Sequence, residues 1–260
     1  MSRYPSRIVC LTEETTETLY LLGCGERVVG ISGFTVRPPE ARQKPKVSTF
    51  TEAKFDRIIE LHPDLVLTFS DLQADIAAEL MRLGIQVVGF NQRTIEEILQ
   101  MMLVVGSLVG KSSDAEVIVA RMEKGLEAAK TQAAAMGRRP KVYFEEWYDP
   151  LICGICWVSE LIEIAGGVDV FREKRIERGA SGRIVPQEEV LARNPEIIIG
   201  SWCGKQFKKQ VVRSRPGWDA IDAVHDDRLF EIRSSLILQP GPAALTDGLR
   251  ELVRVIRSVC

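Results

Sequence analysis

Hydrophobic and polar positions follow one pattern that occurs twice along the chain. A helical stretch ends at a proline followed by an acid and passes directly into a β-rich run, over 55–69 (FDRIIELHPDLVLTF) and again over 187–202 (QEEVLARNPEIIIGSW). The two prolines, Pro63 and Pro195, are 132 residues apart in a chain of 260 residues. A repeat this long indicates duplicated domains, because the repeats of solenoids are roughly 20 to 50 residues long.

Other segments recur in the same order in each half. An apolar run at 7–11 (RIVCL) or 141–144 (KVYF) passes at once into two acids. An apolar helix closed by glycines follows, at 19–30 (LYLLGCGERVVG) or 161–171 (LIEIAGGVDVF). Glycine supplies the left-handed cap at which helices commonly end. We therefore predict two similar α/β lobes, each with the order β-α-β-α-β.

The segment between the halves, 112–137, predicts one long helix. It contains no proline, is rich in Ala, Glu, Lys and Met, and has apolar residues at Val117, Met122 and Leu126. At 1.5 Å per residue it would be about 39 Å long. A flexible linker would instead be rich in Gly and Ser or in Pro. The predicted organisation is an N-terminal lobe (1–110), a connecting helix (111–138) and a C-terminal lobe (139–260).

Composition and charge exclude several classes of protein. The chain is 45% hydrophobic and 27% charged, which is typical of a globular protein. Its net charge is −2, whereas nucleic-acid-binding proteins usually have a basic surface patch. It has no run of about 18 apolar residues, and its N-terminus passes into the first strand without a secretion signal. We therefore expect a monomer that is not membrane-embedded and is cytoplasmic, or extracytoplasmic if a signal was removed.

The loops predicted at the carboxyl ends of the strands are rich in aromatic residues, although Phe, Trp and Tyr make up only 7% of the chain. Ligands of open α/β sheets bind at these loops. Rings that converge from two lobes suit a large flat ligand or a cation. Core packing is an equally good interpretation for each of these rings, and Trp218 is expected to pack in the core. The rings are Phe34, Phe50, Phe69, Trp147, Trp157 and Trp202.

Signs of catalysis are weak. The only histidines, His62 and His225, lie away from the predicted loops, and no G-x-S-x-G, Walker or H-E-x-x-H motif occurs. The adjacent acids Glu145 and Glu146 could serve as an acid/base pair, but successive strand residues point to opposite faces. We therefore expect Glu145 to orient a ligand, and we predict that the protein is not an enzyme and has no cofactor.

The six cysteines lack the spacing of a disulfide scaffold, which favours reduced, buried thiols. Cys153 and Cys156 nevertheless have the C-x-x-C spacing of half a zinc knuckle or of a redox pair, and Cys203 could join them. This spacing leaves a rival interpretation open, a cytosolic metal-binding or metal-dependent protein that uses these three thiols.

The order of the segments resembles the substrate-binding proteins of ABC-type uptake systems in which two Rossmann-like, chelatase-like lobes are joined by one rigid helix. This class III group binds cobalamin, ferric siderophores and haem. The resemblance covers nearly the whole chain and rests on RIVCLTEETTETLYLLGCGERVVGISGF, RPPEA, KVST and HPDLVL, and later on EEWYDPL, WVSELIEIAGG, VLARNPEIII, RPGWDAIDAV and PGPAALTDGL. It implies that a cobalamin-like corrinoid or another metal chelate is bound, without chemical change, in a cleft between the lobes.

The resemblance also implies which residues line that cleft. Phe34, Phe50 and Phe69 match ring positions of cobalamin-binding members. The sequence departs from the family where Glu14 replaces a small residue, Gly182 a stacking Trp and Gln239 an Arg. The complete set of predicted ligand-binding residues is Glu14, Phe34, Phe50, Phe69, Asp71, Asn91, Arg93, Glu145, Trp147, Trp202, Cys203 and Gln239.

Members of the family dock each lobe on a membrane permease through one carboxylate, and the matching positions here are Asp56 and Glu188. Each acid lies seven residues before its repeated proline, so the two are symmetry mates. Acids in a first helical turn are also stabilised by the helix dipole, by about 0.3 to 1 kcal/mol, which leaves a purely structural role open. The predicted partners are therefore a metal chelate and an ABC permease.

Overall fold

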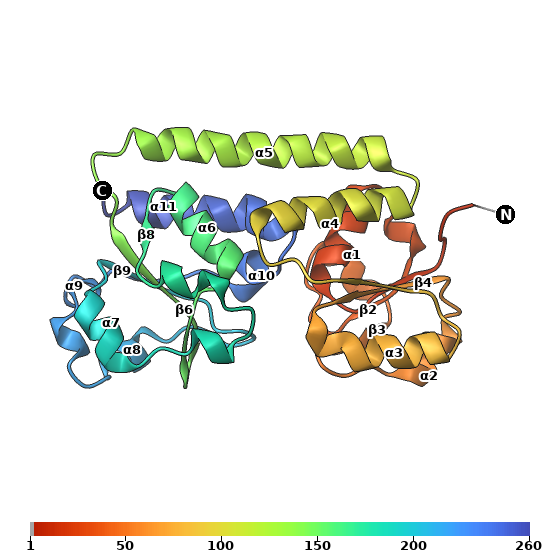
Figure 1. Cartoon of the computed structure of the whole chain (residues 1–260), viewed down its shortest axis with the longest axis horizontal. Helices are drawn as coiled ribbons and strands as arrows, with labels where there is room; N and C mark the ends of the chain where they lie inside the picture. The colour runs from red at the N-terminus through yellow and green to blue at the C-terminus, as the bar shows by residue number, and fades with distance from the viewer. Residues whose placement is uncertain (1–2) are drawn as a thin grey trace. The chain divides into compact units, whose positions relative to one another are not determined.

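The computed structural model describes residues 3–260, and the chain forms two compact units, each an α/β sheet with helices packed on it (Figure 1). Unit 1 runs to Gln92 and includes Glu96–Arg121, and unit 2 comprises Arg93–Ile95 and Met122–Cys260. The predicted fold class, two α/β lobes with parallel sheets, is confirmed. Within the described range, no helix is long and apolar enough to cross a membrane.

The sheet of unit 1 has five parallel strands in the order β3-β2-β1-β4-β5. Every residue of the neighbouring strands β1 and β4 inside the sheet is buried, as expected when helices cover both faces of a parallel sheet. The strands are β1 (Ile8–Cys10), β2 (Val28–Ser32), β3 (Lys46–Ser48), β4 (Leu65–Phe69) and β5 (Val87–Phe90).

Helices cover the two faces of this sheet. Figure 1 shows α2 and α3 on one face and α1 and α4 on the other. One side of the core joins Val9 and Val66 of the strands to Ile58 of α2 and to Ile76 and Leu80 of α3. The helices are α1 (Glu13–Leu21), α2 (Phe55–Glu60), α3 (Ala74–Arg82) and α4 (Ile95–Leu108), with short 3-10 turns η1 (Gly25–Arg27), η2 (Pro39–Gln43) and η3 (Asp71–Gln73).

The sheet of unit 2 has the order β10-β9-β6-β7, and β8 also pairs with β6. β7 runs antiparallel to β6, directly after a turn at Asp149 and Pro150. The prediction that both halves share one β-α-β-α-β order is therefore wrong in detail, because each unit has two further strands, β3 and β5 in unit 1 and β7 and β10 in unit 2. The strands are β6 (Lys141–Tyr148), β7 (Leu151–Cys153), β8 (Val168–Asp169), β9 (Ile197–Gly200) and β10 (Leu229–Glu231).

Aromatic rings form the centre of the core of unit 2. The ring of Tyr143 lies 5.6 Å from Phe171 and 6.3 Å from Trp218, both edge-on, and Trp218 is fully buried, which confirms its predicted packing role. The helices are α6 (Cys156–Ile164), α7 (Gln187–Arg193), α8 (Lys209–Arg213), α9 (Asp222–His225), α10 (Ser234–Ile237) and α11 (Leu249–Arg257), with the short turns η4 (Arg172–Ile176), η5 (Ser181–Arg183), η6 (Trp218–Ala220) and η7 (Ala244–Gly248).

The segment predicted as one long helix is α5 (Ser112–Ala134), a single helix of 23 residues. It ends slightly before the predicted stop at Gly137. The division between the units falls inside it, between Arg121 and Met122. The predicted lobe boundaries at residues 110 and 138 stay a prediction.

Candidate ligand-binding site

The topology of unit 1 singles out one edge of its sheet. β1 and β4 are neighbours, but the chain leaves β1 toward β2 and leaves β4 toward β5, on opposite sides. Ligands of open α/β sheets bind at such a topological switch point, beyond the carboxyl ends of the strands. The switch point lies beside Thr12, which follows β1, and Ser70, which follows β4. Both adjoining loops contain predicted ligand-binding residues.

The acids after β1 are buried in the first turn of α1. Glu14 is only 1% exposed. The hydroxyl of Thr12 donates a hydrogen bond of 2.5 Å to Oε1 of Glu14, whereas Oε2 has no partner. Burial, together with the charge of Glu13, raises the pKa of Glu14 to about 8, and burial raises the pKa of Glu13 to about 7. Within the described residues, neither carboxylate forms a salt bridge with Lys or Arg.

Two aromatic rings are fixed beside the end of β4. Phe69 is 4% exposed, and its ring centroid lies 6.3 Å from that of Phe50. Gln73 joins them, because its Nε2 donates to the carbonyl of Phe50 at 2.9 Å and its Oε1 accepts from the amide of Phe69 at 3.1 Å. Ser70 has φ +71° and ψ 158°, a backbone conformation that is otherwise almost confined to glycine and that concentrates at functional sites.

Large apolar side chains remain exposed in the loops of this edge. Phe34 is 53% exposed after β2, and Leu72 is 60% exposed after β4. Val36 is exposed in the same loop as Phe34. Exposed large apolar side chains in strand-end loops are candidates for ligand contacts. Sequence reasoning found Phe34 but missed Val36, Leu72 and Gln73, although an apolar residue inside the polar runs SGFTVR and SDLQ is a usable signal.

The equivalent edge of unit 2 lies at the ends of β6 and β9. Glu145 is fully buried there and is bound by Arg215, with Nη1 to Oε2 at 2.6 Å and Nη2 to Oε1 at 2.9 Å. The indole Nε1 of Trp202 also donates to Oε1 at 3.0 Å. The guanidinium of Arg215 also lies over the indole of Trp218, 4.3 Å from the ring centroid. Both oxygens of Glu145 are thus engaged inside the unit.

Glu146, the residue next to Glu145, is bound by a different arginine. Arg183 is 2% exposed, and its guanidinium donates to both oxygens of Glu146, at 2.5 and 3.1 Å, and to the carbonyl of Cys153 at 2.6 Å. Glu145 and Glu146 therefore have separate partners, as expected for successive strand residues. Sequence reasoning missed both arginines, because they lie 37 and 70 residues away from the acids that they bind.

Four rings at this edge form a continuous series of tilted and edge-on contacts, which we call the aromatic ladder: Trp147, Tyr148, Trp202 and Phe207. Successive ring centroids are 5.1, 4.5 and 5.1 Å apart. Trp202 is buried, whereas Trp147 and Tyr148 are half-buried. The ammonium of Lys205 donates to the hydroxyl of Tyr148 at 3.0 Å and lies 4.8 Å from the ring centroid of Trp147. Tyr148 and Phe207 were not predicted as site residues.

The remaining predicted residues occupy varied positions. Trp157 is a core residue of α6, 2% exposed, and its indole donates to the carbonyl of Ile237 at 2.9 Å. Asp71, Asn91, Arg93 and Cys203 follow strands, whereas Gln239 follows helix α10 and not the strand end that was predicted for it; the binding roles of all five stay predictions. Of these, Asp71, Asn91 and Cys203 are exposed, and Arg93 and Gln239 are half-buried.

The cysteine pair gives no support to the metal-binding interpretation. Cys153 ends β7 and Cys156 opens α6, and both are buried. Burial raises the pKa of the Cys153 thiol to about 12, which disfavours the thiolate needed for metal binding or redox chemistry. Among residues 3–260, no group of three or more His, Cys, Asp or Glu side chains is placed to hold a metal ion. The metal-dependent alternative is therefore not favoured.

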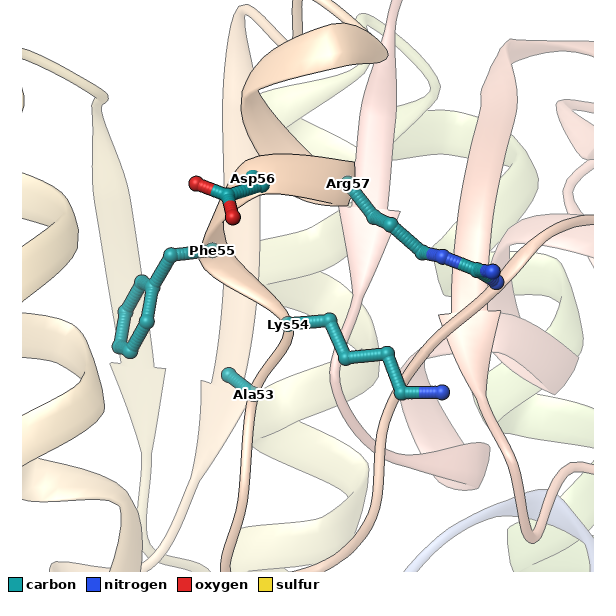
Figure 2. Close-up of a pocket in the computed structure, with 5 residues that line it drawn as sticks. All are labelled: Ala53, Lys54, Phe55, Asp56 and Arg57. Carbon is teal, nitrogen blue, oxygen red and sulfur yellow. The ribbon is translucent and has the colours of Figure 1, made fainter.

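The two predicted docking acids are both exposed near the start of a short helix. Asp56 is the second residue of α2, and Glu188 is the second residue of α7. Asp56 borders a shallow pocket of about 500 Å³ lined by residues 53–57. Figure 2 shows the carboxylate of Asp56 and the ring of Phe55 on one side, and the cationic ends of Lys54 and Arg57 on the other. This surface therefore presents both signs of charge beside an aromatic ring.

Two α/β units with parallel sheets and ring-lined strand ends define a two-lobed substrate-binding protein. Residues 8–236 match the family model described as periplasmic binding protein. The chain belongs to this family, which confirms the family resemblance found in the sequence.

Individual relatives cover most of the chain at low identity. The uncharacterized ABC transporter substrate-binding lipoprotein YvrC of Bacillus subtilis (strain 168) is 26% identical over 98% of this chain and 81% of its own length. A vitamin B12-binding protein of Vibrio cholerae is 23% identical over 92% of this chain and 85% of its own. The solved structure of the periplasmic heme-binding protein RhuT from Roseiflexus sp. RS-1 has a TM-score of 0.82 and 22% identity, covering 96% of this chain and 99% of that one.

The predicted cytoplasmic location is wrong. The family is one of periplasmic binding proteins, and the Bacillus subtilis relative is a lipoprotein. The prediction relied on the first few residues alone, whereas the family match rests on 8–236, which form most of both units.

Proposed function

We propose that this protein is the substrate-binding component of an ABC-type uptake system and binds a metal chelate of the corrinoid, haem or siderophore type without changing it chemically. Membership of the periplasmic binding protein family supports the substrate-binding role. The B12-binding and heme-binding relatives support the chelate class. The observation that carries the proposal is the aromatic ladder, whose outer rings Trp147 and Tyr148 are half-buried at the strand ends of unit 2.

The binding free energy that these rings can supply shows how much other contacts must contribute. If a flat ligand covered about 100 Å² on each of two rings, apolar burial would contribute roughly 5 kcal/mol. A dissociation constant of about 1 μM requires about 8 kcal/mol, after the costs of association have been met. Further contacts, polar ones among them, must supply the remainder. The proposed ligand is therefore both flat and rich in hydrogen-bonding groups.

The strand-end acids of unit 2 favour binding over catalysis. A general acid or base must exchange a proton with the substrate. Glu145 and Glu146 instead have all four carboxylate oxygens bonded to arginines that are themselves almost fully buried. Their role in the proposed function is to hold the strand ends and the ladder in place.

Delivery of the ligand would require a permease, and we propose that Asp56 and Glu188 are the docking contacts. Both carboxylates are exposed and occupy the same helix position in the two duplicated units. Exposed acids of this kind suit arginines on a partner surface, because guanidinium binds carboxylate through two parallel hydrogen bonds. The pocket beside Asp56 adds the ring of Phe55 to this surface.

Titration of the purified protein with hydroxocobalamin, hemin and a ferric hydroxamate siderophore tests the function. We expect a spectral shift and a calorimetric dissociation constant at or below about 10 μM for at least one of them, and we expect mass spectrometry to recover that chelate unchanged. Trp147→Ala should weaken the binding. Absence of binding of all three at about 100 μM, which corresponds to less than roughly 5.5 kcal/mol, would overturn the proposal.

A further inference from the structure

The duplication provides an internal comparison of buried acids. Glu13 and Glu14 follow β1 in unit 1, and Glu145 and Glu146 lie near the end of β6 in unit 2, so both pairs sit at a topological switch point. Each acid of unit 2 is neutralised by a buried arginine. Neither acid of unit 1 has such a partner among the described residues. The equivalent position in unit 1 therefore lacks a counter-charge.

In unit 1, the missing partner can be assigned to one atom of Glu14. Oε1 of Glu14 accepts the hydrogen bond from Thr12, but Oε2 is buried and has no hydrogen-bond partner. A buried polar atom without a partner costs about 1 to 3 kcal/mol, and such atoms are rare in native structures outside functional sites. The helix dipole at the start of α1 offsets only about 0.3 to 1 kcal/mol. A partner for Oε2 therefore has to come from elsewhere.

The cations close to α1 are engaged by other groups: Nε of Arg37, in the loop after β2, donates to Oε1 of Glu17 at 3.0 Å. β1 contributes the titratable group Cys10, β2 contributes none, and the turn η1 contributes Glu26 and Arg27. The guanidinium of Arg27 donates to the carbonyl of Val109 at 2.9 Å, so it is engaged elsewhere. A metal ion is an unsuitable partner as well, since no three-ligand group is present among residues 3–260.

This inference rests on the proposed function: we propose that Glu14 determines specificity. In its ionised form, Oε2 accepts a hydrogen bond from an N–H or cationic group on the rim of the chelate. The ionised acid pair correspondingly disfavours chelates whose rim carries carboxylates. The favoured class is a chelate with amide or amine substituents, and Glu14 lies beside the switch point of unit 1, where ligands of open α/β sheets bind.

The raised pKa values of Glu13 and Glu14 make the preference between chelates depend on pH, and they fix the direction of that dependence. The pKa is about 7 for Glu13 and about 8 for Glu14 in the ligand-free protein. As the pH rises from about 6 to 9, both groups lose their protons, and Glu14 becomes a stronger acceptor and a stronger repellent of anions. Discrimination against carboxylated chelates should therefore increase over this range.

Two matched ligand pairs test the inference: dicyanocobinamide with dicyanocobyrinic acid, and hemin dimethyl ester with hemin. Within each pair the macrocycle is kept and the rim changes from amide or ester to carboxylate. Calorimetry at pH 6 and pH 8.5 would compare the natural protein with Glu14→Gln, Glu14→Ala and the control Glu26→Gln, whose side chain is exposed in η1. We expect the natural protein and the control to prefer the uncharged member at least tenfold more strongly at pH 8.5 than at pH 6.

The Glu14 variants should lose most of this pH-dependent preference. If they retain it, or if the natural protein shows no preference between the members of a pair that it binds, the inference about Glu14 is wrong while the proposed function stands. The comparison of the two members of a ligand pair in the natural protein needs no variant, so it does not depend on how well the variants fold. If the natural protein binds no chelate at all, the proposed function itself fails, and the inference fails with it.

Discussion

Asp56 and Glu188 occupy the same position in their helices, each as the second residue, of α2 and of α7 respectively. Each also lies seven residues before a repeated proline, so the equivalence was visible in the sequence. Neither acid caps its helix, because the N-cap residues are Lys54 and Pro186, and the helix dipole stabilises an acid in the first turn by only about 0.3 to 1 kcal/mol.

Removal of either acid should impair transport and leave ligand binding unchanged. Truncating one partner of a charge pair that is buried at an interface typically costs about 2 to 5 kcal/mol. We expect Asp56→Ala and Glu188→Ala each to lower uptake at least tenfold in proteoliposomes that contain the cognate permease. Glu60→Ala is the matched control, because Glu60 is an exposed acid at the other end of α2. Normal uptake by both variants would contradict the docking proposal.

The pair of Glu145 and Arg215 should be critical for stability. Removing one member of a buried ion pair typically costs about 3 to 5 kcal/mol, because the other charge is left buried without a partner. We expect Arg215→Ala to lower the free energy of unfolding by this amount in urea titrations followed by tryptophan fluorescence. The double change Glu145→Gln with Arg215→Met should cost much less, since no unpaired charge remains. Equal losses in the single and double variants would argue against this account.

The sequence predicted the repeated framework of the fold because local patterns encode it. The proline corners at Pro63 and Pro195 precede β4 and β9, and the proline-free segment after Ser112 forms α5. The hairpin of β6 and β7 was missed. Its apolar residues Leu151 and Ile152 follow the turn at Asp149 and Pro150 so closely that they read as part of a loop.

The sequence could predict individual residues of the site, but not the contacts between residues that are far apart in the chain. Phe50 and Phe69 were each predicted as ligand-binding rings, but the sequence did not show that the two rings lie only 6.3 Å apart. The sequence placed Glu145 near the strand end, but it did not show Arg215, because a contact over 70 residues leaves no local pattern. The missing partner of Glu14 was equally hidden, since the absence of a contact follows only from the packing of the whole unit.

The outer ring of the aromatic ladder should contribute directly to ligand affinity. Stacking of a flat group on an aromatic side chain contributes about 1 to 3 kcal/mol in nucleic-acid complexes, and a comparable gain is expected here. We therefore expect Trp147→Ala to weaken chelate binding about 5- to 100-fold, whereas Trp147→Phe should retain most of the affinity. Calorimetry on both variants would check this. Equal losses for Phe and Ala would show that the indole N–H, which donates to the carbonyl of Asp149 at 2.9 Å, matters more than the ring face.

The ligand-free protein should lose stability as the pH rises, because of Glu13 and Glu14. Burial raises their pKa values from the ordinary 4.5 to about 7 and about 8. Between these limits the folded state binds more protons than the unfolded state, so the stabilising contribution is complete below about pH 4.5 and is lost as the pH rises through 7 and 8. Since one pKa unit corresponds to about 1.4 kcal/mol, the fall should amount to a few kcal/mol.

Urea unfolding at pH 5, 7 and 8.5 would measure this fall, and Glu14→Gln isolates the contribution of one group. The amide cannot ionise, so the variant should lose less stability than the natural protein between pH 5 and 8.5. The control Glu26→Gln should follow the natural protein, because that carboxylate is exposed and lies outside the buried first turn of α1. Identical pH profiles for the natural protein and Glu14→Gln would mean that Glu14 does not titrate in this range, since a buried group that changes its charge must alter the balance of protons between the folded and unfolded states.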